Sequence, residues 1–355
     1  MTHSGIRFLG ARIVIGVKIY MKKIGVIGAG TWGTALAILL NENGNQVTLW
    51  THRSSEAEKI RNTHEHSKLP GVTVPEQIFV TADMAEAVGN NEILVMVVPS
   101  TCVRETCEKM VPYVKEGTII VSASKGIEES TLKTMTDIVE EVLPQAEPAV
   151  LSGPSHAEEV AKGLPTTCVI GAKTEETARL LQGIFMSPCF RVYISSDMLG
   201  IELGGAMKNV IALAAGIADG MGYGDNAKAA LITRGIVEIS RLGMKMGGKL
   251  ETFSGLTGIG DLIVTCASMH SRNRRAGILL GKGYSMEEAM KEVNMVVEGV
   301  YSAKSALLLA KKYDTELPII EQVNHILFDG KDPKEAVSNL MLRDSKLENS
   351  LIPWQ

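Results

Sequence analysis

The pattern of hydrophobic positions changes near Asp197. Before that point, short apolar and β-branched runs end in turn residues and are separated by segments with helical spacing. This alternation predicts an α/β fold with a large, mostly parallel sheet, to which an antiparallel edge could be added. The predicted strands are residues 23–27, 46–50, 93–98, 118–122, 149–151, 168–170 and 191–195, and the clearest helices are 31–40 and 175–185.

After Asp197 only helical spacing remains. At 355 residues the chain is also long for a single core. We therefore expect a loose extension at 1–20, an α/β domain at 21–200 and an all-α domain at 201–355. The predicted helices are 198–219, 302–313, 318–328 and 332–341, with others after the turn at 258–260 and from about Ser271.

A glycine motif joins the first predicted strand to the first helix. Gly28, Gly30 and Gly33 form the pattern G-x-G-x-x-G. The first glycine allows a sharp bend, the second lets a pyrophosphate approach the backbone, and the third lets the helix pack against the strand. Unpaired N–H groups at the helix N-terminus then hold the phosphates. The motif predicts a Rossmann-like dinucleotide-binding domain rather than a glycine-rich structural turn.

The end of the second strand bears on which dinucleotide binds. An acidic residue there usually binds the ribose 2′-hydroxyl of NAD, whereas this strand is followed by Thr51, His52 and Arg53. A guanidinium can pair with the 2′-phosphate of NADP. Unless Arg53 is only a surface residue, the sequence predicts a domain able to bind NADP, and leaves the preference between NADP and NAD open.

Lys208 is the strongest candidate for chemistry in the helical part. It lies next to Asn209 in a helix otherwise rich in Gly, Ala, Leu and Ile. Burying a lysine is costly unless it is paired or loses its proton. Its helical neighbours provide no polar face along which it could reach solvent. We therefore favour a functional lysine over one that extends to the surface.

Further polar residues follow predicted strands and turns. Lys125 comes directly after a central strand, where an anionic ligand could meet it, although a solvated loop lysine would fit this position equally well. A small-residue turn spans 152–157. Asp261 and Thr265 are four residues apart and share one helix face. The segment 271–275 has cationic and amide donors that suit a phosphate, although a solvated basic turn would have the same composition.

Composition narrows the choice of partners. A net charge of −4 argues against a general nucleic-acid surface, and no run of about 18 apolar residues indicates a membrane span. The five cysteines are scattered, which suits a reduced, cytoplasmic protein without a disulfide framework or zinc site.

His64 and His66 lie in a polar loop, so we expect both to be solvated and expect no metal. No cleavage site follows the basic N-terminus, so a signal peptide is disfavoured and we expect the functional chain to begin at Met21.

Six motifs in register resemble those of the bacterial NAD(P)-dependent glycerol-3-phosphate dehydrogenase family. The resemblance covers nearly the whole chain from Met21. It departs at Thr31, where serine is common, and at residues 1–20, which have no recognised counterpart. The motifs are Gly28-x-Gly30-Thr31-Trp32-Gly33, Ser124-Lys125-Gly126, Ser152-Gly153-Pro154-Ser155, Met207-Lys208-Asn209, Gly258-x-Gly260-Asp261 and Ser271-Arg272-Asn273.

The resemblance implies a role for each of these residues. Lys208 would be the proton donor and acceptor, and Lys125, Asp261 and Thr265 would complete the catalytic set. The substrate would be bound by Lys125, Gly153, Ser155, Lys208, Asn209, Asp261, Ser271, Arg272 and Asn273. NAD or NADP would contact Gly28, Gly30, Thr31, Trp32, Gly33, His52, Arg53, Lys125, Ala157, Arg272, Val296 and Glu298.

The implied reaction is reversible hydride transfer between NAD(P)H and dihydroxyacetone phosphate. Its product, sn-glycerol 3-phosphate, is a precursor of glycerophospholipids. A lysine ammonium could stabilise charge on the carbonyl oxygen and deliver the proton. The alternatives are a β-hydroxyacid dehydrogenase of the 6-phosphogluconate type and a non-catalytic NADP(H) sensor. The resemblance and the Gly- and Ala-rich helix faces also imply a homodimer.

Overall fold

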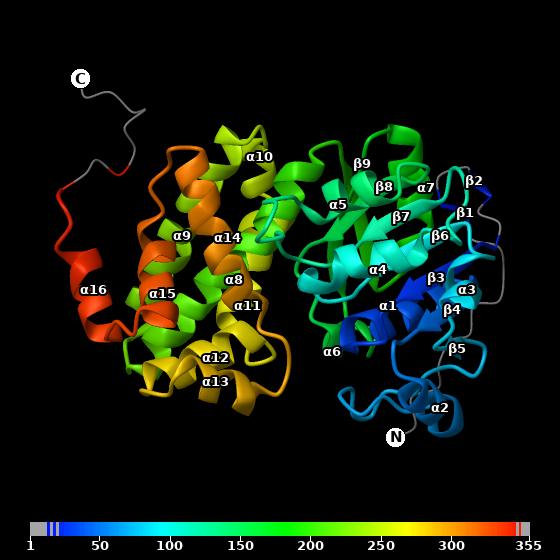
Figure 1. Cartoon of the computed structure of the whole chain (residues 1–355), viewed down its shortest axis with the longest axis horizontal. Coiled ribbons are helices and arrows are strands. Elements are labelled where there is room, and N and C mark those ends of the chain that lie inside the picture. The colour runs from blue at the N-terminus through cyan, green and yellow to red at the C-terminus, as the bar shows by residue number, and fades with distance from the viewer. Residues whose placement is uncertain (1–12, 15–16, 19–20, 346–347, 349–355) are drawn as a thin grey trace.

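The computed structural model describes residues 13–14, 17–18, 21–345 and 348. Strands occupy the chain up to Ser195, and only helices follow (Figure 1). We call residues 21–196 the sheet half, on the right of Figure 1, and residues 197–345 the helical half. The described residues before Met21 form a short antiparallel pair, β1 (Ile13–Val14) with β2 (Val17–Lys18). The rest of the predicted extension lies outside the described residues.

An eight-stranded sheet forms the centre of the sheet half. Its order is β10-β9-β8-β7-β6-β3-β4-β5, and β3 to β8 run parallel. β9 pairs antiparallel with β8 and parallel with β10, so the antiparallel edge is confirmed. The strands are β3 (Lys23–Ile27), β4 (Gln46–Trp50), β5 (Phe79–Thr81), β6 (Ile93–Met96), β7 (Ile119–Ser122), β8 (Glu147–Ser152), β9 (Thr166–Ala172) and β10 (Phe190–Ser195).

Helices cover both faces of this sheet, which is why its central strands are apolar throughout. In β6, Ile93 and Val95 join the core on one face, and Leu94 and Met96 join the core on the other. A short 3₁₀ turn, Ser100–Cys102, follows β6. The helices are α1 (Thr31–Glu42), α2 (Ser54–Thr63), α3 (Met84–Val88), α4 (Val103–Met110), α5 (Met135–Val142), α6 (Ala157–Val160) and α7 (Glu175–Phe185).

The helical half is built around α8 (Met198–Gly220), which is buried along most of its length. Small residues let α12 (Arg272–Gly281) cross it closely, since a Cβ on Gly277 would lie 2.3 Å from the carbonyl oxygen of Leu213. The other elements are α9 (Asp225–Lys245), α10 (Leu250–Phe253), the π turn Leu256–Gly260, α11 (Asp261–Ala267), α13 (Met286–Val293), α14 (Glu298–Lys312), α15 (Pro318–Phe328) and α16 (Pro333–Met341).

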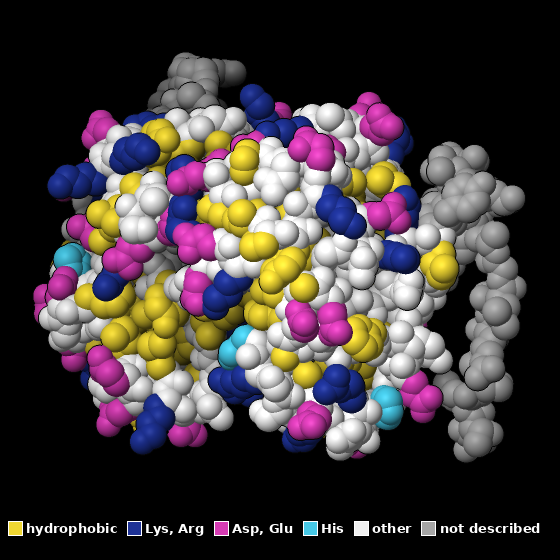
Figure 2. Space-filling model, turned by 45° about the vertical axis from the view of Figure 1, so that its right-hand side comes forward, with side chains coloured by type: hydrophobic (Ala, Val, Ile, Leu, Met, Phe, Trp, Pro, Cys, Tyr) yellow, Lys and Arg dark blue, Asp and Glu magenta, His cyan; other side chains and the backbone are white. Residues whose placement is uncertain are grey.

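By length and composition alone, α8 could cross a membrane. Every residue of its most apolar stretch is nevertheless buried inside the structure, as in the core helix of a globular fold. Figure 2 shows a face on which Lys and Arg side chains are interspersed with Asp and Glu. Among the described residues of that face, no field of a single charge dominates, and hydrophobic side chains gather in a hollow on the left of the view.

The two halves meet at the carboxyl ends of the parallel strands. The loops after β6, β7 and β8 each reach the helical half, and α8 follows β10 directly. Glu202 of α8 accepts hydrogen bonds from the backbone N–H of Thr136 at 2.9 Å and from its hydroxyl. The predicted domain boundary between residues 200 and 201 lies within α8 and stays a prediction.

Candidate active site

One buried carboxylate joins two lysines from opposite halves. Asp261 Oδ1 accepts from Lys208 Nζ at 2.6 Å, and Oδ2 accepts from Lys125 Nζ at 2.7 Å. Lys208 also donates to Thr265 Oγ1 at 2.7 Å. Asp261 is 1% exposed and Lys208 is 6% exposed. These four residues form what we call the Asp261 cluster.

Close backbone packing brings this cluster together. Lys208 lies in the middle of α8, and Asp261 begins α11 directly after the π turn. The turn lies against α8 because Gly204 has no side chain: a Cβ there would lie 2.5 Å from the carbonyl oxygen of Thr257. A Cβ on Gly258 would lie 1.9 Å from the carbonyl oxygen of Phe253. The lack of a side chain at both glycines therefore allows Asp261 to lie beside Lys208.

Burial and charge set the protonation of the cluster. Burial lowers the pKa of Lys208 to about 8; Asp261 opposes this shift and Lys125 adds to it. Burial alone would raise the pKa of Asp261, but the two ammonium groups lower it below its usual range. Asp261 is therefore a carboxylate at neutral pH, and Lys208 can gain or lose its proton in that range.

The turn after β8 supplies further polar groups to the cluster. Gly153, at φ +141°, directs its carbonyl oxygen to Lys125 Nζ at 3.0 Å. The Ser155 hydroxyl donates to the same oxygen at 2.9 Å. His156 comes next, and its buried Nε2 has no hydrogen-bond partner among the described residues. Burial lowers the pKa of this imidazole; Lys208 adds to the shift and Asp261 opposes it. No local pattern in the sequence marks His156 as a neighbour of the Asp261 cluster.

Two amides connect α8, α12 and α14 beside Lys208. Asn273 Nδ2 donates to Asn209 Oδ1 at 2.9 Å, and Asn273 Oδ1 accepts from the N–H of Gly299 at 2.8 Å. Asn209 Nδ2 donates to the Gly205 carbonyl at 3.3 Å. Each amide has a second N–H beyond these bonds, so the pair could still donate to a ligand.

Arg272 is the first residue of α12, where a cation is unfavourable next to the helix dipole. Its N-cap, Ser271, is buried and accepts from the Arg274 N–H at 3.2 Å. Burial lowers the pKa of Arg272, while Glu298 and Glu158 raise it. Among the described residues no ion pair involves Arg272. A guanidinium and a helix N-terminus at one place suit an anionic group such as a phosphate.

The glycine turn has the geometry that a dinucleotide requires. Gly28 has φ +123°, and a Cβ on Gly33 would lie 1.8 Å from the carbonyl oxygen of Gly28. A Cβ on Gly30 would meet no atom of the described residues within 4 Å, so none of them covers the backbone there. α1 has neither a side-chain cap nor an acid in its first turn, and β3 lies between β4 and β6 at the switch point of the sheet. These residues fit a diphosphate group.

The other predicted cofactor residues come from several elements of both halves. Thr31 and Trp32 begin α1, the former buried and the latter partly so. His52 and Arg53 are exposed after β4, and the Arg53 Nε donates to His52 Nε2 at 3.1 Å. The remaining three come from other elements: Ala157 is the first residue of α6, Val296 lies between α13 and α14, and Glu298 is the first residue of α14.

The solvated-loop prediction was wrong for His66. The ring is 4% exposed, its Nε2 lies 3.0 Å from the carbonyl oxygen of Ala29, and its Nδ1 accepts from the Lys68 N–H at 3.2 Å. Its loop folds over the glycine turn, a contact that no local pattern reveals. His64 is partly buried. Within the described residues no three His, Cys, Asp or Glu side chains gather as metal ligands, and the five cysteines are free thiols.

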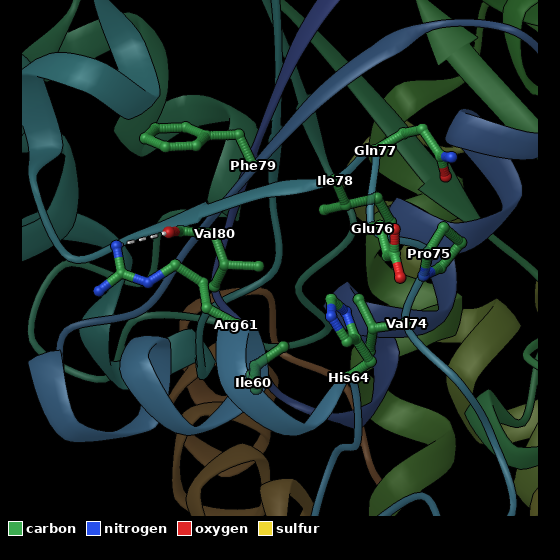
Figure 3. A pocket seen from close by; sticks show the side chains of 10 residues that line it. All are labelled: Ile60, Arg61, His64, Val74, Pro75, Glu76, Gln77, Ile78, Phe79 and Val80. Atoms are coloured by element: carbon green, nitrogen blue, oxygen red, sulfur yellow. Dashed lines mark hydrogen bonds between the residues drawn. The ribbon is translucent and has the colours of Figure 1, made fainter.

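A separate hollow lies at the edge of the sheet half (Figure 3). Arg61 lines it and donates to the carbonyl oxygen of Val80 at 3.4 Å. It contains none of the predicted site residues, so we place the chemistry at the Asp261 cluster. The hollow is lined by Ile60, Arg61, His64, Val74, Pro75, Glu76, Gln77, Ile78, Phe79 and Val80.

Comparison with known proteins matches both halves of the chain to one family. The family model for the NAD-dependent glycerol-3-phosphate dehydrogenase N-terminus matches residues 23–178, and the model for its C-terminus matches residues 197–338. A protein of Agathobacter rectalis named glycerol-3-phosphate dehydrogenase (NAD(P)+) is 61% identical over 336 residues, covering 94% of this chain and 100% of the relative. A protein of the same name from Fusobacterium nucleatum is 62% identical over 331 residues, covering 92% and 99%.

Solved structures agree. The crystal structure of glycerol-3-phosphate dehydrogenase from Coxiella burnetii is 38% identical, with a TM-score of 0.88, over 91% of this chain and 99% of that chain. A D-mandelate dehydrogenase structure is 14% identical with a TM-score of 0.60, over 90% of this chain and 100% of that chain, and shows a similar fold only. The findings support the predicted family over the β-hydroxyacid alternative. The chain belongs to the NAD-dependent glycerol-3-phosphate dehydrogenase family.

Proposed function

We propose that this protein interconverts dihydroxyacetone phosphate and sn-glycerol 3-phosphate with NAD(P)H or NAD(P)+. The observation that carries the proposal is Asp261, which holds one lysine from each half at the carboxyl edge of the sheet. A redox sensor would need no such acid–base set. A nicotinamide cofactor bound at the glycine turn would donate the hydride in one direction of the reaction and accept it in the other.

Lys208 is the proton donor and acceptor in this proposal. During reduction, negative charge develops on the C2 oxygen of the substrate, and the Lys208 ammonium stabilises it and gives up a proton. During oxidation the neutral amine takes a proton from the hydroxyl. A pKa of about 8 makes both forms accessible near neutral pH. Asp261 orients the amine, Lys125 adds positive charge, and Thr265 fixes the rotamer of Lys208.

The phosphate of the substrate would be bound at the N-terminus of α12. Arg272 provides charge, and Ser271 and Asn273 shape the backbone and amide donors around it. Asn209, Gly153 and Ser155 would complete the substrate pocket. Holding the phosphate there fixes the position of C2 relative to Lys208. The phosphate site would thus help the reaction by orienting the substrate, although the phosphate itself does not react.

The sheet half would bind the cofactor through Gly28, Gly30 and Gly33, with Arg53 and His52 exposed where a 2′-phosphate would lie. We propose that NADP is used at least as well as NAD. The cofactor would also meet Thr31, Trp32, Lys125, Ala157, Arg272, Val296 and Glu298.

The proposal extends to the protein's setting. We infer two domains, at 21–200 and 201–355, a cytoplasmic location and a role in glycerophospholipid precursor synthesis. We also infer a homodimer, for which α9 offers exposed small residues such as Ala229 and Ala230. The mass in solution, measured by light scattering, tests the dimer: a monomer at micromolar concentration would reject it.

Initial rates test the reaction itself. Purified protein should oxidise NADPH or NADH with dihydroxyacetone phosphate and reduce NADP+ or NAD+ with sn-glycerol 3-phosphate. We expect turnover of 6-phosphogluconate and of small 3-hydroxyacids to be lower by at least about a hundredfold in kcat/KM. Binding of NADPH without turnover of any of these substrates would reject the enzyme in favour of the sensor.

A further inference from the structure

The loop after β6 and the start of α14 are joined by a carboxylate that bridges the two halves. Glu298 Oε1 accepts from the backbone N–H of Ser100 at 3.1 Å, and Oε2 accepts from the Ser100 hydroxyl at 2.5 Å. Both oxygens of Glu298 are thus held by one residue, which lies 198 positions away in the sequence. The Ser100 side chain is 5% exposed, so this contact belongs to the interior of the junction.

The glycine after Lys125 explains how Ser100 reaches this place. A Cβ on Gly126 would lie 2.2 Å from Ser100 Cβ and 2.4 Å from its hydroxyl oxygen. It would also lie 3.6 Å from Glu298 Oε2. Gly126 has no positive φ, so space rather than backbone conformation requires a glycine. The motif Ser124-Lys125-Gly126 therefore combines a lysine of the Asp261 cluster with room for Ser100.

The Ser100 bonds leave Glu298 able to bind a ligand. A carboxylate has about four lone-pair sites, and Ser100 occupies two of them. Burial raises the pKa of Glu298 above its usual value, and the two Ser100 bonds and the positive charge of Arg272 offset part of this rise in favour of the carboxylate. Glu298 also begins α14, where negative charge is favourable. Ser100 thus holds Glu298 in one orientation and keeps it as an acceptor for hydroxyl groups.

We propose that Ser100 is a positioning residue for cofactor binding, which acts by fixing the carboxylate of Glu298, and that Gly126 is required to make room for it. This inference rests on the proposed function, in which Glu298 contacts the cofactor. The chemistry that a fixed carboxylate recognises is a pair of neighbouring hydroxyls, such as those of a cofactor ribose. Ser100 itself need not touch the cofactor.

A double-mutant cycle tests this inference, with the Kd of NADPH measured by fluorescence on the full chain without substrate. Glu298→Ala should raise Kd at least about tenfold, and Ser100→Ala about three- to tenfold, because the backbone N–H bond to Glu298 remains. In the Glu298→Ala background, Ser100→Ala should change Kd by less than about twofold. Gly126→Ala should raise Kd at least as much as Ser100→Ala. Thr101→Ala removes a neighbouring, exposed hydroxyl and should leave Kd unchanged.

Kinetics separate positioning from general damage. Ser100→Ala should raise KM for NADPH while kcat at saturating NADPH stays within about twofold. Ser100→Cys keeps a weak donor of similar size and should recover part of the affinity, which also serves as the readout if the alanine variant does not fold. The inference is rejected if Ser100→Ala leaves Kd unchanged while Glu298→Ala raises it, or if the two effects simply add. If Glu298→Ala has no effect on Kd, the cofactor role of Glu298 fails, and this inference fails with it.

Discussion

The glycine turn of the sheet half acts through its backbone, whereas the Asp261 cluster, which joins both halves, acts through buried charge. At the glycine turn, function depends on the absence of side chains: Gly28 takes φ +123°, and Gly33 packs directly onto the carbonyl of Gly28. At the Asp261 cluster, function depends on side chains that are expensive to bury, and each is kept by a partner within 2.7 Å. A backbone site needs only a short stretch of chain, while a charge site needs residues far apart.

This difference separates the two sites in kinetic terms. Changes at the glycine turn should act on cofactor binding and appear in KM or Kd. Changes at the Asp261 cluster should act on the transition state and appear in kcat. A glycine-turn variant that lowers kcat, or an Asp261-cluster variant that changes only cofactor binding, would show that the two sites do not divide binding and chemistry between them.

The largest effect is expected at Lys208. Lys208→Ala removes the proton donor and its charge together, so kcat should fall by at least about a thousandfold while the Kd of NADPH is largely kept. Lys208→Arg should recover little, because guanidinium holds its proton and has a different shape. Lys228→Ala is the matched control: it removes a lysine of the same half that pairs with Asp219 at 2.8 Å, and kcat should change less than twofold, roughly. A folded Lys208→Ala protein with a tenth of the normal kcat would move the role to Lys125.

The next largest effect concerns the substrate phosphate. Arg272→Ala should raise KM for dihydroxyacetone phosphate by about ten- to a hundredfold, since a charge-assisted hydrogen bond is lost. Unphosphorylated dihydroxyacetone, a poor substrate from the start, should lose much less. If kcat/KM falls by the same factor for both compounds, Arg272 serves the cofactor or the fold instead.

Arg53 tests the cofactor side of the comparison. Arg53→Asp should raise KM for NADPH more than about tenfold, because a cation is replaced by a charge that repels the 2′-phosphate. KM for NADH should change far less, and kcat should stay the same with both. Arg61→Ala is the control: Arg61 lies in α2, the helix that Arg53 precedes, but donates to the Val80 carbonyl, so neither KM should change. Equal losses with both cofactors would show that Arg53 does not contact the 2′-phosphate.

The smallest effect is on stability and involves a buried acid remote from the chemistry. Glu238 accepts from the N–H groups of Ile319 and Ile320 at the start of α15, and burial raises its pKa to about 7. The folded protein then keeps a proton that the unfolded chain releases near pH 4.5, so stability falls as pH rises from about 4.5 to 7. The slope from this one group is at most about 1.4 kcal/mol per pH unit.

Glu238→Gln removes this titration while keeping an oxygen that can accept from Ile319. Urea unfolding between pH 5 and 8, roughly, should therefore show a shallower decline for the variant than for the parent protein. Burial also raises the pKa of Glu202, at the junction of the halves, to about 7. The pH dependence of unfolding of Glu202→Gln can therefore be compared with that of Glu238→Gln. Parallel declines for Glu238→Gln and the parent would exclude Glu238 as the source.

Most of the fold could be predicted because its signals are local. Every predicted strand is present within two residues of its expected ends. The three-residue β5 was missed, since half of Phe79 is exposed and its apolar run is too short to stand out. The helix expected at 302–313 begins earlier, at Glu298. Its start could not be predicted, because an acid after two valines gives little sign of a helix N-terminus.

The site could be predicted as a set of residues but not as a geometry. Lys125, Lys208 and Asp261 were named from their surroundings in the sequence, yet nothing local indicates that one carboxylate holds both amines. The sequence also left the direction of the pKa shift of Lys208 open, because Asp261 and burial act oppositely. His66 and the bridge from Ser100 to Glu298 depend on contacts between distant segments, which hydrophobic spacing does not report.

The central claim is that Lys208 exchanges the proton with the substrate, and opposing pH profiles test it most directly. kcat/KM should be measured in both directions between about pH 7 and 10. Reduction needs the ammonium and should fall as pH rises through about 8, while oxidation needs the neutral amine and should rise through the same value. Profiles that stay flat across this range, as expected of a lysine with the ordinary pKa of about 10.4, would contradict the claim.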